Sequence, residues 1–559
     1  MKIFKHIFHF GLVVSILFIV SCQDNKPKSN PAFSNIDLLR GDIIMCSGKQ
    51  FGEVSFSLSC KYSVRETFDL AISLLHSFEY DEAEKAFVNV IDADPDCAMA
   101  YWGVAMSIYH ALWEPPSADK LVKGARVLKI AESLPKTERE KEYLDAIGLY
   151  YKDWENIDAK TRASKMENKM EEIYRKYRDD KEAAILYALA LNSTADPTDK
   201  NYTNQRKAGS ILESIFLEQP NHPGIAHYII HSYDNPVLAE KALPLAKKYA
   251  EIAPASAHAQ HMPSHIFTRL GLWNESISSN LNSTASAVCY AEEADYKAHW
   301  DEELHGMDYL VYAYLQKGDN KKAIALNEYL NTMEKVYPVN FKDAYAIAAI
   351  PARIAMENKD WIKAANLELS PIAFPWEEFP WQKSILHFSR AIGACHLGDV
   401  NEAESEIAIL ETLHQNLIKS GNQYQANQVM IQLKASKAWL NFAKGKHEEA
   451  IALMNEAADM EDNTTKHPVT PCEIIPAREL LGDLLLALNQ PLESLKAFEI
   501  DIQYHPKRLN GIYGAAIAAK MNGNLKVAKA YFEQLIKQTE SVDTDRMELQ
   551  EAKEFLSKI

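Results

Sequence analysis

The sequence predicts an all-α protein, a solenoid in which antiparallel helix pairs stack into a right-handed superhelix. Composition is the first reason, because 20 glycines in 559 residues, with 47% hydrophobic and 25% charged residues, are typical of a helical globular protein rather than of turn-rich β structure. A repeated spacing of small, aromatic and proline residues is the second reason. Since a solenoid lengthens by adding repeats, the length of the chain does not require several separate domains.

The repeated spacing places two small residues twelve positions apart, an aromatic residue four positions later and a proline eight positions after that. The two full copies are Ala71, Ala83, Phe87, Pro95 and Gly482, Ser494, Phe498, Pro506. This spacing resembles positions 8, 20, 24 and 32 of the 34-residue tetratricopeptide repeat. Small residues allow two antiparallel helices to approach closely, and the proline ends the second helix.

The resemblance divides the mature chain into blocks of repeats around one region that lacks the period. In that region we expect extra helices, around residues 120–190, packed on the array. The expected division is 51–119 for an N-terminal repeat pair, 120–205 for a helical insertion, 206–370 for central repeats with a histidine-rich concave face, and 371–559 for C-terminal repeats.

The first 50 residues are typical of a targeting and anchoring segment. Lys2 and Lys5 precede an apolar stretch, residues 7–20, that is too short to span a bilayer comfortably. Ser21-Cys22 resembles the end of a bacterial lipobox, which implies cleavage before Cys22 and acylation of that cysteine. An ordinary cleaved signal followed by a chance cysteine is the alternative. The expected division is a signal peptide at 1–21 and a lipidated flexible tether at 22–50.

The expected anchor makes the membrane a partner and places the protein in the cell envelope of a Gram-negative bacterium. Attachment would be to the outer membrane, on its periplasmic or its surface face. The net charge is −17, and the mature region has no basic cluster. Because phosphate binding needs clustered Lys and Arg, we expect no nucleic acid partner.

Two cysteines stand just before the first helices of consecutive repeats, Cys60 and Cys97. The starts of neighbouring first helices are adjacent in a stacked array, and an exported chain can form disulfides. A Cys60–Cys97 disulfide is therefore one expectation. Free, buried thiols are the alternative, and Cys46 is a competing partner for Cys60.

Two pairs of histidines occupy the same slots in consecutive repeats. His227 and His231 fall at positions 5 and 9 of one repeat, and His261 and His265 fall at positions 5 and 9 of the next. Residues four apart share one face of a helix. Positions 2, 5, 9, 12 and 13 face the groove in tetratricopeptide arrays, so the resemblance implies a polar concave groove. The other expected groove residues are His76, Trp102, His110, Asp234, Arg269, His305, Asp308 and Arg353.

Three interpretations of these histidines remain open. The favoured one is a groove that binds an extended peptide or a polar small ligand by hydrogen bonds and stacking. The second is a metal site for Zn, Fe or Cu, although no Glu follows the first histidine as it does in the metalloprotease helix. The third is a structural role in helix packing. The candidate metal ligands are His227, His231, His261 and His265.

Pro263 affects the geometry expected for the second pair of histidines. Proline is tolerated in the first turn of a helix but costs about 3 kcal/mol inside one. If the helix begins at Pro263, His261 lies at a helix start, and the second pair need not be parallel to the first.

Several segments also resemble a family of exported bacterial tetratricopeptide lipoproteins, among them "HPGIAHYIIHSYDNP", "HAQHMPSHIFTRLGLWNESI" and "KHPVTPCEIIPARELLGDLLL". The resemblance runs from about Val54 to the C-terminus. It implies a fold and an export route, but no particular activity. Cys472 stands where relatives commonly have glycine. The preceding "KHPVTP" is either a capping turn, which we favour, or a groove-lining loop.

We therefore expect a cell-envelope lipoprotein that acts as a binding or scaffold component through its histidine-rich groove. It would be accessory to a nutrient or polysaccharide utilisation system. The alternative is a metal-dependent hydrolase or oxidase that uses the stacked HxxxH pairs. The sequence contains no nucleophile elbow, phosphate loop or dinucleotide fingerprint, so no catalytic residue is assigned and a non-enzymatic role is preferred.

Overall fold

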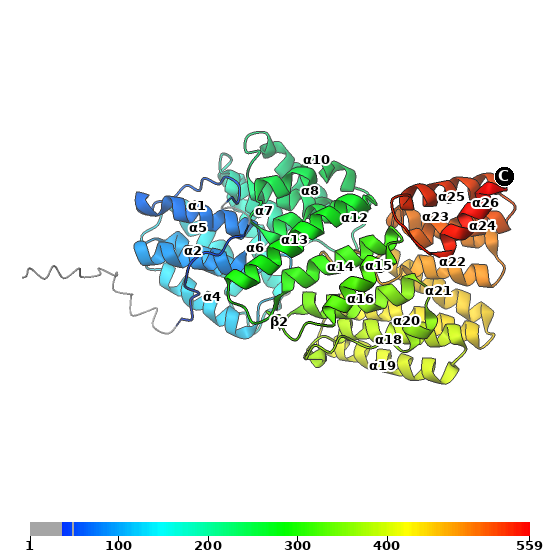
Figure 1. Ribbon diagram of the computed structural model, residues 1–559. Helices are drawn as coiled ribbons and strands as arrows, with labels where there is room; N and C mark the ends of the chain where they lie inside the picture. Colours follow the sequence, from blue (N-terminus) through cyan, green and yellow to red (C-terminus); the bar gives the residue numbers. More distant parts are fainter. Residues whose placement is uncertain (1–35, 47–49, 114, 559) are drawn as a thin grey trace, which may run out of the picture.

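Antiparallel helices stacked in chain order make up the protein (Figure 1). The computed structural model describes residues 36–46, 50–113 and 115–558. Within these residues, the only strands are the two-residue β1 and β2, which pair in parallel. The predicted all-α solenoid of tetratricopeptide type is therefore confirmed.

The helices of the first half have the following bounds: α1 Arg65–His76, α2 Tyr80–Ala93, α3 Ala98–Tyr109, α4 Ala118–Ala131, α5 Glu138–Tyr151, α6 Ala159–Lys176, α7 Lys181–Ser193, α8 Thr203–Phe216, α9 Pro223–Tyr233, α10 Ala239–Ile252, α11 Ala257–His261, α12 Pro263–Arg269 and α13 Trp273–Glu293. A short 3-10 helix, η2 Tyr62–Val64, precedes α1.

The second half continues as β1 His299–Trp300, α14 Asp301–Gln316, α15 Asn320–Leu330, β2 Val336–Tyr337, α16 Phe341–Glu357, α17 Trp361–Ala365, η3 Trp376–Glu378, α18 Pro380–Leu397, α19 Val400–Lys419, α20 Gln423–Ala443, α21 His447–Asp462, α22 Ala477–Ala487, α23 Pro491–Tyr504, α24 Leu509–Met521, α25 Leu525–Thr539 and α26 Met547–Ser557.

The repeated small and aromatic residues are the points where neighbouring helices touch. Phe87 on α2 is fully buried, and a Cβ added to Gly103 on α3 would come within 2.3 Å of its ring. Phe498 on α23 fills the same role against Gly482 on α22, where an added Cβ would be 2.7 Å away. The spacing read in the sequence therefore marks close helix contacts, which a side chain at either glycine would force apart.

Helices α4 to α7 cover most of the region in which an insertion of extra helices was predicted. α5 packs on α6, α6 on α7, and α7 on α8, in chain order. Helix packing does not require the small-residue period to be exact, so a region without that period can still extend the solenoid.

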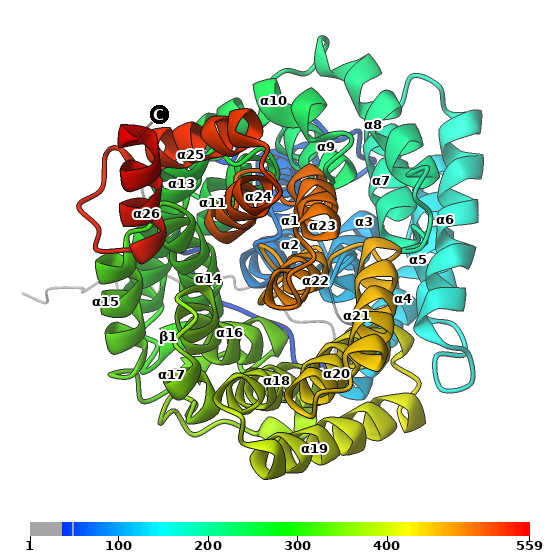
Figure 2. The ribbon, with the colours of Figure 1, turned by 90° about the vertical axis from the view of Figure 1, so that its right-hand side faces the viewer.

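The C-terminal helices turn back onto the middle of the chain. Figure 2 shows α22, α23 and α24 near the centre of the ring that the other helices form in that view, and α24 contacts α14. Arg508, fully buried at the start of α24, pairs with Glu357 at 2.8 Å and with Glu479 at 2.8 Å. This return places side chains of the C-terminal part against α14 and α16.

Two disulfides tie the N-terminal part to the solenoid. Cys60 bonds to Cys97, and Cys46 bonds to Cys289 on α13 rather than to Cys60. Cys395 and Cys472 are free and buried. The second disulfide holds the segment before α1 against a helix more than 240 residues away in sequence, since its two cysteines are separated by 243 positions.

The predicted signal peptide and the predicted lipidation site, Cys22, lie outside the described residues. Among the residues that the structure does describe, no helix is both long and apolar enough to cross a bilayer.

Replacing Cys46 and Cys289 together by serine should lower the free energy of unfolding by about 2–5 kcal/mol, because the crosslink restricts a long loop in the unfolded chain. Thermal denaturation of the variant and the parent, both without reductant, measures the difference. Adding reductant should lower the parent's Tm toward that of the variant.

Non-reducing peptide mapping of the parent is the control. It should recover the Cys46 peptide linked to the Cys289 peptide. Recovery of Cys46 linked to Cys60 would contradict the pairing.

Candidate metal centre

Two groups of three histidines face one another inside the solenoid. The first histidine cluster consists of His227 and His231 on α9 and His258 on α11. The Nε2 atom of His227 lies 3.1 Å from Nε2 of His231 and 3.2 Å from Nε2 of His258. All three ligand nitrogens lie within 4.8 Å of one another, which is the spacing expected around a single metal ion.

The second histidine cluster consists of His261 on α11, His265 on α12 and His305 on α14. The Nε2 atoms of His261 and His265 are 3.0 Å apart, and the ring centroids of His261 and His305 are 4.1 Å apart. Again, three imidazole nitrogens lie within 4.8 Å of one another.

The two clusters are neighbours because one short helix, α11, contributes a histidine to each. His258, the second residue of α11, belongs to the first cluster, and His261, the last residue of α11, belongs to the second. The ring centroids of His258 and His261 are 6.2 Å apart, and those of His231 and His265 are 5.9 Å apart. The site therefore contains six imidazoles in one continuous group.

A break between α11 and α12 shapes the second cluster. α11 ends at His261, and α12 begins at Pro263 with the proline in its first turn, where proline is tolerated. His261 thus lies at the end of a helix and not at the helix start that was considered from the sequence. His261 and His265 nevertheless keep their Nε2 atoms 3.0 Å apart. The proline thus interrupts the helix without separating the pair.

In four of the six rings, the Nδ1 atom, which faces away from the cluster, contacts an oxygen acceptor. The Nδ1 atom of His227 contacts the His76 carbonyl oxygen at 2.6 Å, and Nδ1 of His258 contacts a Glu302 carboxylate oxygen at 3.4 Å. The remaining two contacts are His261 Nδ1 to Asn280 Oδ1 at 2.6 Å and His265 Nδ1 to Asp234 Oδ2 at 2.9 Å. These oxygens only accept hydrogen bonds, so each Nδ1 carries the proton.

The orientation of Asn280 supports this assignment. Its amide nitrogen donates to the Ser276 carbonyl oxygen at 2.8 Å, which turns its amide oxygen toward His261. His261 must then donate from Nδ1 and keep Nε2 unprotonated. The same tautomer follows for His227, His258 and His265 from their own acceptors.

Unprotonated Nε2 atoms thus face one another at 3.2 Å between His227 and His258 and at 3.0 Å between His261 and His265. Two lone pairs at this distance repel each other unless a cation lies between them. Burial lowers the pKa of His227, His231 and His261 well below the ordinary histidine value, and neighbouring imidazoles lower it further. A proton is therefore a poor shared cation, whereas a metal ion binds the neutral form of imidazole.

Aromatic rings cover the first cluster. Phe78 lies 4.3 Å from His227, 5.8 Å from His231 and 5.5 Å from His258, measured between ring centroids. Its backbone has φ of 59°, a left-handed conformation that is uncommon for a bulky residue. Such strain is retained where the surrounding structure requires it, often at functional sites.

Tyr309 on α14 covers the second cluster, with its ring 4.6 Å from that of His261 and 5.2 Å from that of His265. An aromatic ring therefore lies against each cluster. The hydrophobic part of the surroundings of a metal site controls solvent access and the redox potential of the metal.

The carboxylates nearest the clusters are already paired with buried cations. Asp234 accepts from Arg269 at 3.0 Å and from Lys466 at 2.7 Å, besides His265. Glu302 pairs with Lys342 at 2.5 Å. Burial raises the pKa of Asp234, but the charge of Arg269 and the hydrogen bond from His265 lower it, to about 2. These carboxylates therefore orient ligands rather than serve as free bases.

The structure brings the side chains of seven of the predicted groove residues together around the site. The side chains of the other five lie elsewhere, and of these five His76 reaches the site through its carbonyl oxygen. Gathered there are His227, His231, Asp234, His261, His265, Arg269 and His305. The other five are His76, Trp102, His110, Asp308 and Arg353.

Those five residues belong to other contacts. His76 bonds to Glu182 and Tyr228, Trp102 packs on Phe56 and Tyr143, and His110 stacks on Tyr80. Asp308 and Arg353 form an ion pair at 2.9 Å.

The predicted open groove is absent at the histidine clusters of the described chain. His227 and His261 have no exposed surface, and His258, His265 and His305 are buried. The reason is the return of the C-terminal part, whose loop 463–476 enters the interior and brings Lys466 to Asp234. The loop that we favoured as a capping turn therefore contacts groove residues.

Neither His258 nor Glu302 was among the predicted site residues. His258 falls at position 2 of its repeat, the same slot as His305, and position 2 is one of the groove positions. That shared slot was the signal that would have found it. Glu302 has no such signal, because only the fold brings α14 against α11.

Comparison with known proteins supports the repeat assignment. Residues 68–111 match the tetratricopeptide repeat family model. No curated protein matches the chain. Because tetratricopeptide repeats serve as protein-binding scaffolds, the match supports a scaffold role at that general level.

Similar solved structures include the human IFIT1 dimer with m7Gppp-AAAA, at 15% identity and a TM-score of 0.33 over 87% of this chain and 97% of that chain. Another is the human IFIT1 dimer with PPP-AAAA, at 13% identity and a TM-score of 0.36 over 87% of this chain and 96% of that chain. Similarity at this level is too low to transfer a function.

Asp234→Asn should lower the free energy of unfolding by about 3–5 kcal/mol, because it leaves Arg269 and Lys466 as buried charges without an anion. Chemical denaturation of the metal-free protein measures this. Asp543→Asn is the matched control, since Asp543 is 99% exposed in its pair with Lys321, and it should change nothing measurable. Equal effects of the two substitutions would contradict the buried network.

Proposed function

We propose that the protein is a metalloprotein whose two histidine clusters hold a pair of copper ions, and that it acts as an oxidoreductase. The observation that carries this proposal is the convergence of Nε2 atoms in each cluster, with Nδ1 of four rings bound to oxygen acceptors. Outer-sphere acceptors of this kind are the usual partners of metal-binding histidines.

The ligand chemistry supports copper. Imidazole nitrogens suit Zn, Cu, Fe and Ni, whereas Mg, Ca and Mn prefer oxygen. Among divalent ions, copper binds such sites most tightly. Three protein ligands per ion leave a coordination position for a substrate or small ligand, as in catalytic zinc sites.

The surroundings support redox chemistry over hydrolysis. A hydrolytic site needs a free general base beside the bound water. Asp234 and Glu302 are both engaged by cations and by ligand imidazoles. The rings of Phe78 and Tyr309 lie against the histidines instead.

Two adjacent ions can act together. The clusters approach within about 6 Å, as the 5.9 Å between the rings of His231 and His265 indicates. Two copper(I) ions supply two electrons, which is the number that one dioxygen molecule takes up on reduction to the peroxide level. Dioxygen is therefore the co-reactant that this proposal implies.

The predicted cell-envelope location is part of the proposal. The Cys46–Cys289 and Cys60–Cys97 disulfides are what an oxidising compartment allows. The lipobox-like segment before Cys22 supports attachment to the outer membrane. The association with nutrient or polysaccharide uptake stays a prediction.

A protein-binding role is compatible with the metal centre but would use other surfaces. Binding an extended peptide at the histidines requires open surface, and the rings of both clusters are largely buried. The scaffold role that the repeats support would therefore involve the outer faces of the helices.

Tag-free protein reconstituted with copper(I) should contain about two copper ions per chain, measured by elemental analysis after gel filtration. His227→Ala and His261→Ala should each reduce the content to about one, because each removes a ligand from one cluster. His414→Ala is the matched control, since His414 lies on α19, away from both clusters. Metal-free protein with unchanged circular dichroism after reconstitution would overturn the proposal.

Cys22→Ala should move the protein from the membrane fraction to the soluble periplasmic fraction, because the lipid anchor is lost. Immunoblotting of cell fractions measures the distribution. Asn30→Ala, within the same tether, is the control and should leave the protein in the membrane fraction. Soluble parent protein would contradict the predicted anchor.

A further inference from the structure

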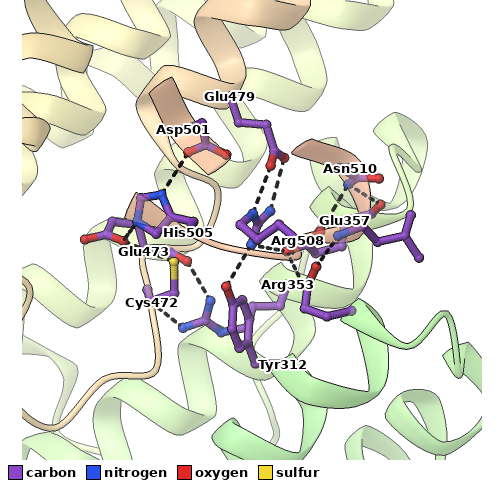
Figure 3. A network of polar contacts seen from close by, with 12 residues as sticks. Tyr312, Arg353, Glu357, Cys472, Glu473, Glu479, Asp501, His505, Arg508 and Asn510 are labelled. Carbon is purple, nitrogen blue, oxygen red and sulfur yellow. Dashed lines mark hydrogen bonds and ion pairs between the residues drawn. The ribbon is translucent and has the colours of Figure 1, made fainter. Parts of the chain in front are cut away.

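A third set of metal-ligating side chains lies between the loop 463–476 and the end of α23 (Figure 3). We propose that Cys472, Glu473 and His505 form a separate binding site for one zinc ion. This site shares no ligand with the two histidine clusters, so it can be tested independently of the copper centre.

The three ligand atoms converge on one point. Sγ of Cys472 lies 3.1 Å from Oε2 of Glu473, and Nε2 of His505 lies 3.2 Å from the same oxygen. All three atoms lie within 4.8 Å of one another. Thiolate, imidazole and carboxylate are the three ligand types that zinc takes in proteins.

Neighbouring groups hold each ligand in place. Nδ1 of His505 contacts Oδ1 of Asp501 at 2.8 Å, which turns Nε2 toward Cys472 and Glu473 (Figure 3). Arg353 donates to the carbonyl oxygens of Cys472 at 2.7 Å and of Glu473 at 2.6 Å. The carboxylate behind His505 and the fixed loop backbone are features of a preorganised metal site.

The charges of the site suit a divalent ion. A Cys472 thiolate and the Glu473 carboxylate carry two negative charges, which one Zn²⁺ neutralises while His505 stays neutral. The nearest guanidinium groups are already matched, Arg508 by Glu479 and Glu357, and Arg353 by Asp308. In the metal-free chain His505 pairs with Glu473 and Asp501, and a zinc ion would take the place of the proton on its Nε2 atom.

The site borders a cleft. Glu473 and His505 line a small cleft, whose wall also includes Asp234 and Arg269. Three protein ligands leave the fourth zinc position open, and this geometry is typical of catalytic rather than structural zinc. Asp234 holds His265 of the second histidine cluster, so the two centres flank one cleft.

Cobalt(II) tests the site because a thiolate ligand gives an intense near-ultraviolet charge-transfer absorption that imidazole ligands do not give. Metal-free full-length protein, reduced at its free thiols, is titrated with Co²⁺ and then with Zn²⁺. We expect the absorption to saturate at about one Co²⁺ per chain and to disappear as Zn²⁺ displaces it.

Cys472→Ser should abolish this absorption, and Cys395→Ser, the matched control at the other buried free thiol, should keep it. Glu473→Gln should weaken Co²⁺ binding at least about tenfold, because it removes a charged ligand. It also keeps the test decisive if Cys472→Ser fails to fold. Circular dichroism of each metal-free variant monitors the fold.

Absence of the absorption in the parent, or its survival in Cys472→Ser, would overturn the proposal and leave a hydrogen-bonded network of Cys472, Glu473 and His505. Neither result bears on the copper centre, because the histidine clusters contain no sulfur ligand. Conversely, His227→Ala and His261→Ala should leave the cobalt absorption unchanged.

Discussion

Imidazole lone pairs that face one another inside a buried core are the constraint on which the candidate centre depends. The carbonyl of His76, the amide of Asn280 and the carboxylate of Asp234 fix the protons on the outer nitrogens. The inner nitrogens of His227 and His258, and those of His261 and His265, then face one another as acceptors, in an interior where His227 and His261 are fully buried. Leaving buried polar atoms unsatisfied is costly. A metal ion in each cluster removes that cost, which is why the arrangement points to metal binding rather than to packing.

The closure of the solenoid depends on buried arginines. Arg353 joins α16 to the backbone of loop 463–476, and Arg508 joins α24 to Glu357 on α16. Both guanidinium groups are fully buried and have carboxylate partners, without which a charge in the interior would be strongly destabilising. These pairs hold the C-terminal turn against the centre. The same closure covers the histidines and creates the cleft beside Asp234.

Local sequence patterns were sufficient for the repeat and for part of the site. Ala71, Phe87, Gly482 and Phe498 gave the helix-pair class, because close helix packing requires small residues opposite large ones. The separation of four gave the common face of each histidine pair. The repeat slot of His258 marks it as a groove residue, but its place in the first cluster rather than the second was not accessible in this way. Nor was the Cys46–Cys289 disulfide, whose cysteines are 243 positions apart. Contacts between distant segments leave no periodic signal.

The sequence by itself determined that the chain forms stacked helices and that the two histidines of each pair lie on the same side. Both follow from interactions between residues a few positions apart. Only the tertiary structure decided that six imidazoles form two adjacent clusters, that Asp234 and Glu302 stand behind them, and that the groove is filled. The physical reason is that small rotations from repeat to repeat accumulate along a solenoid. Which turns of the superhelix come into contact therefore depends on the whole chain and on long-range pairs such as Arg508 with Glu357.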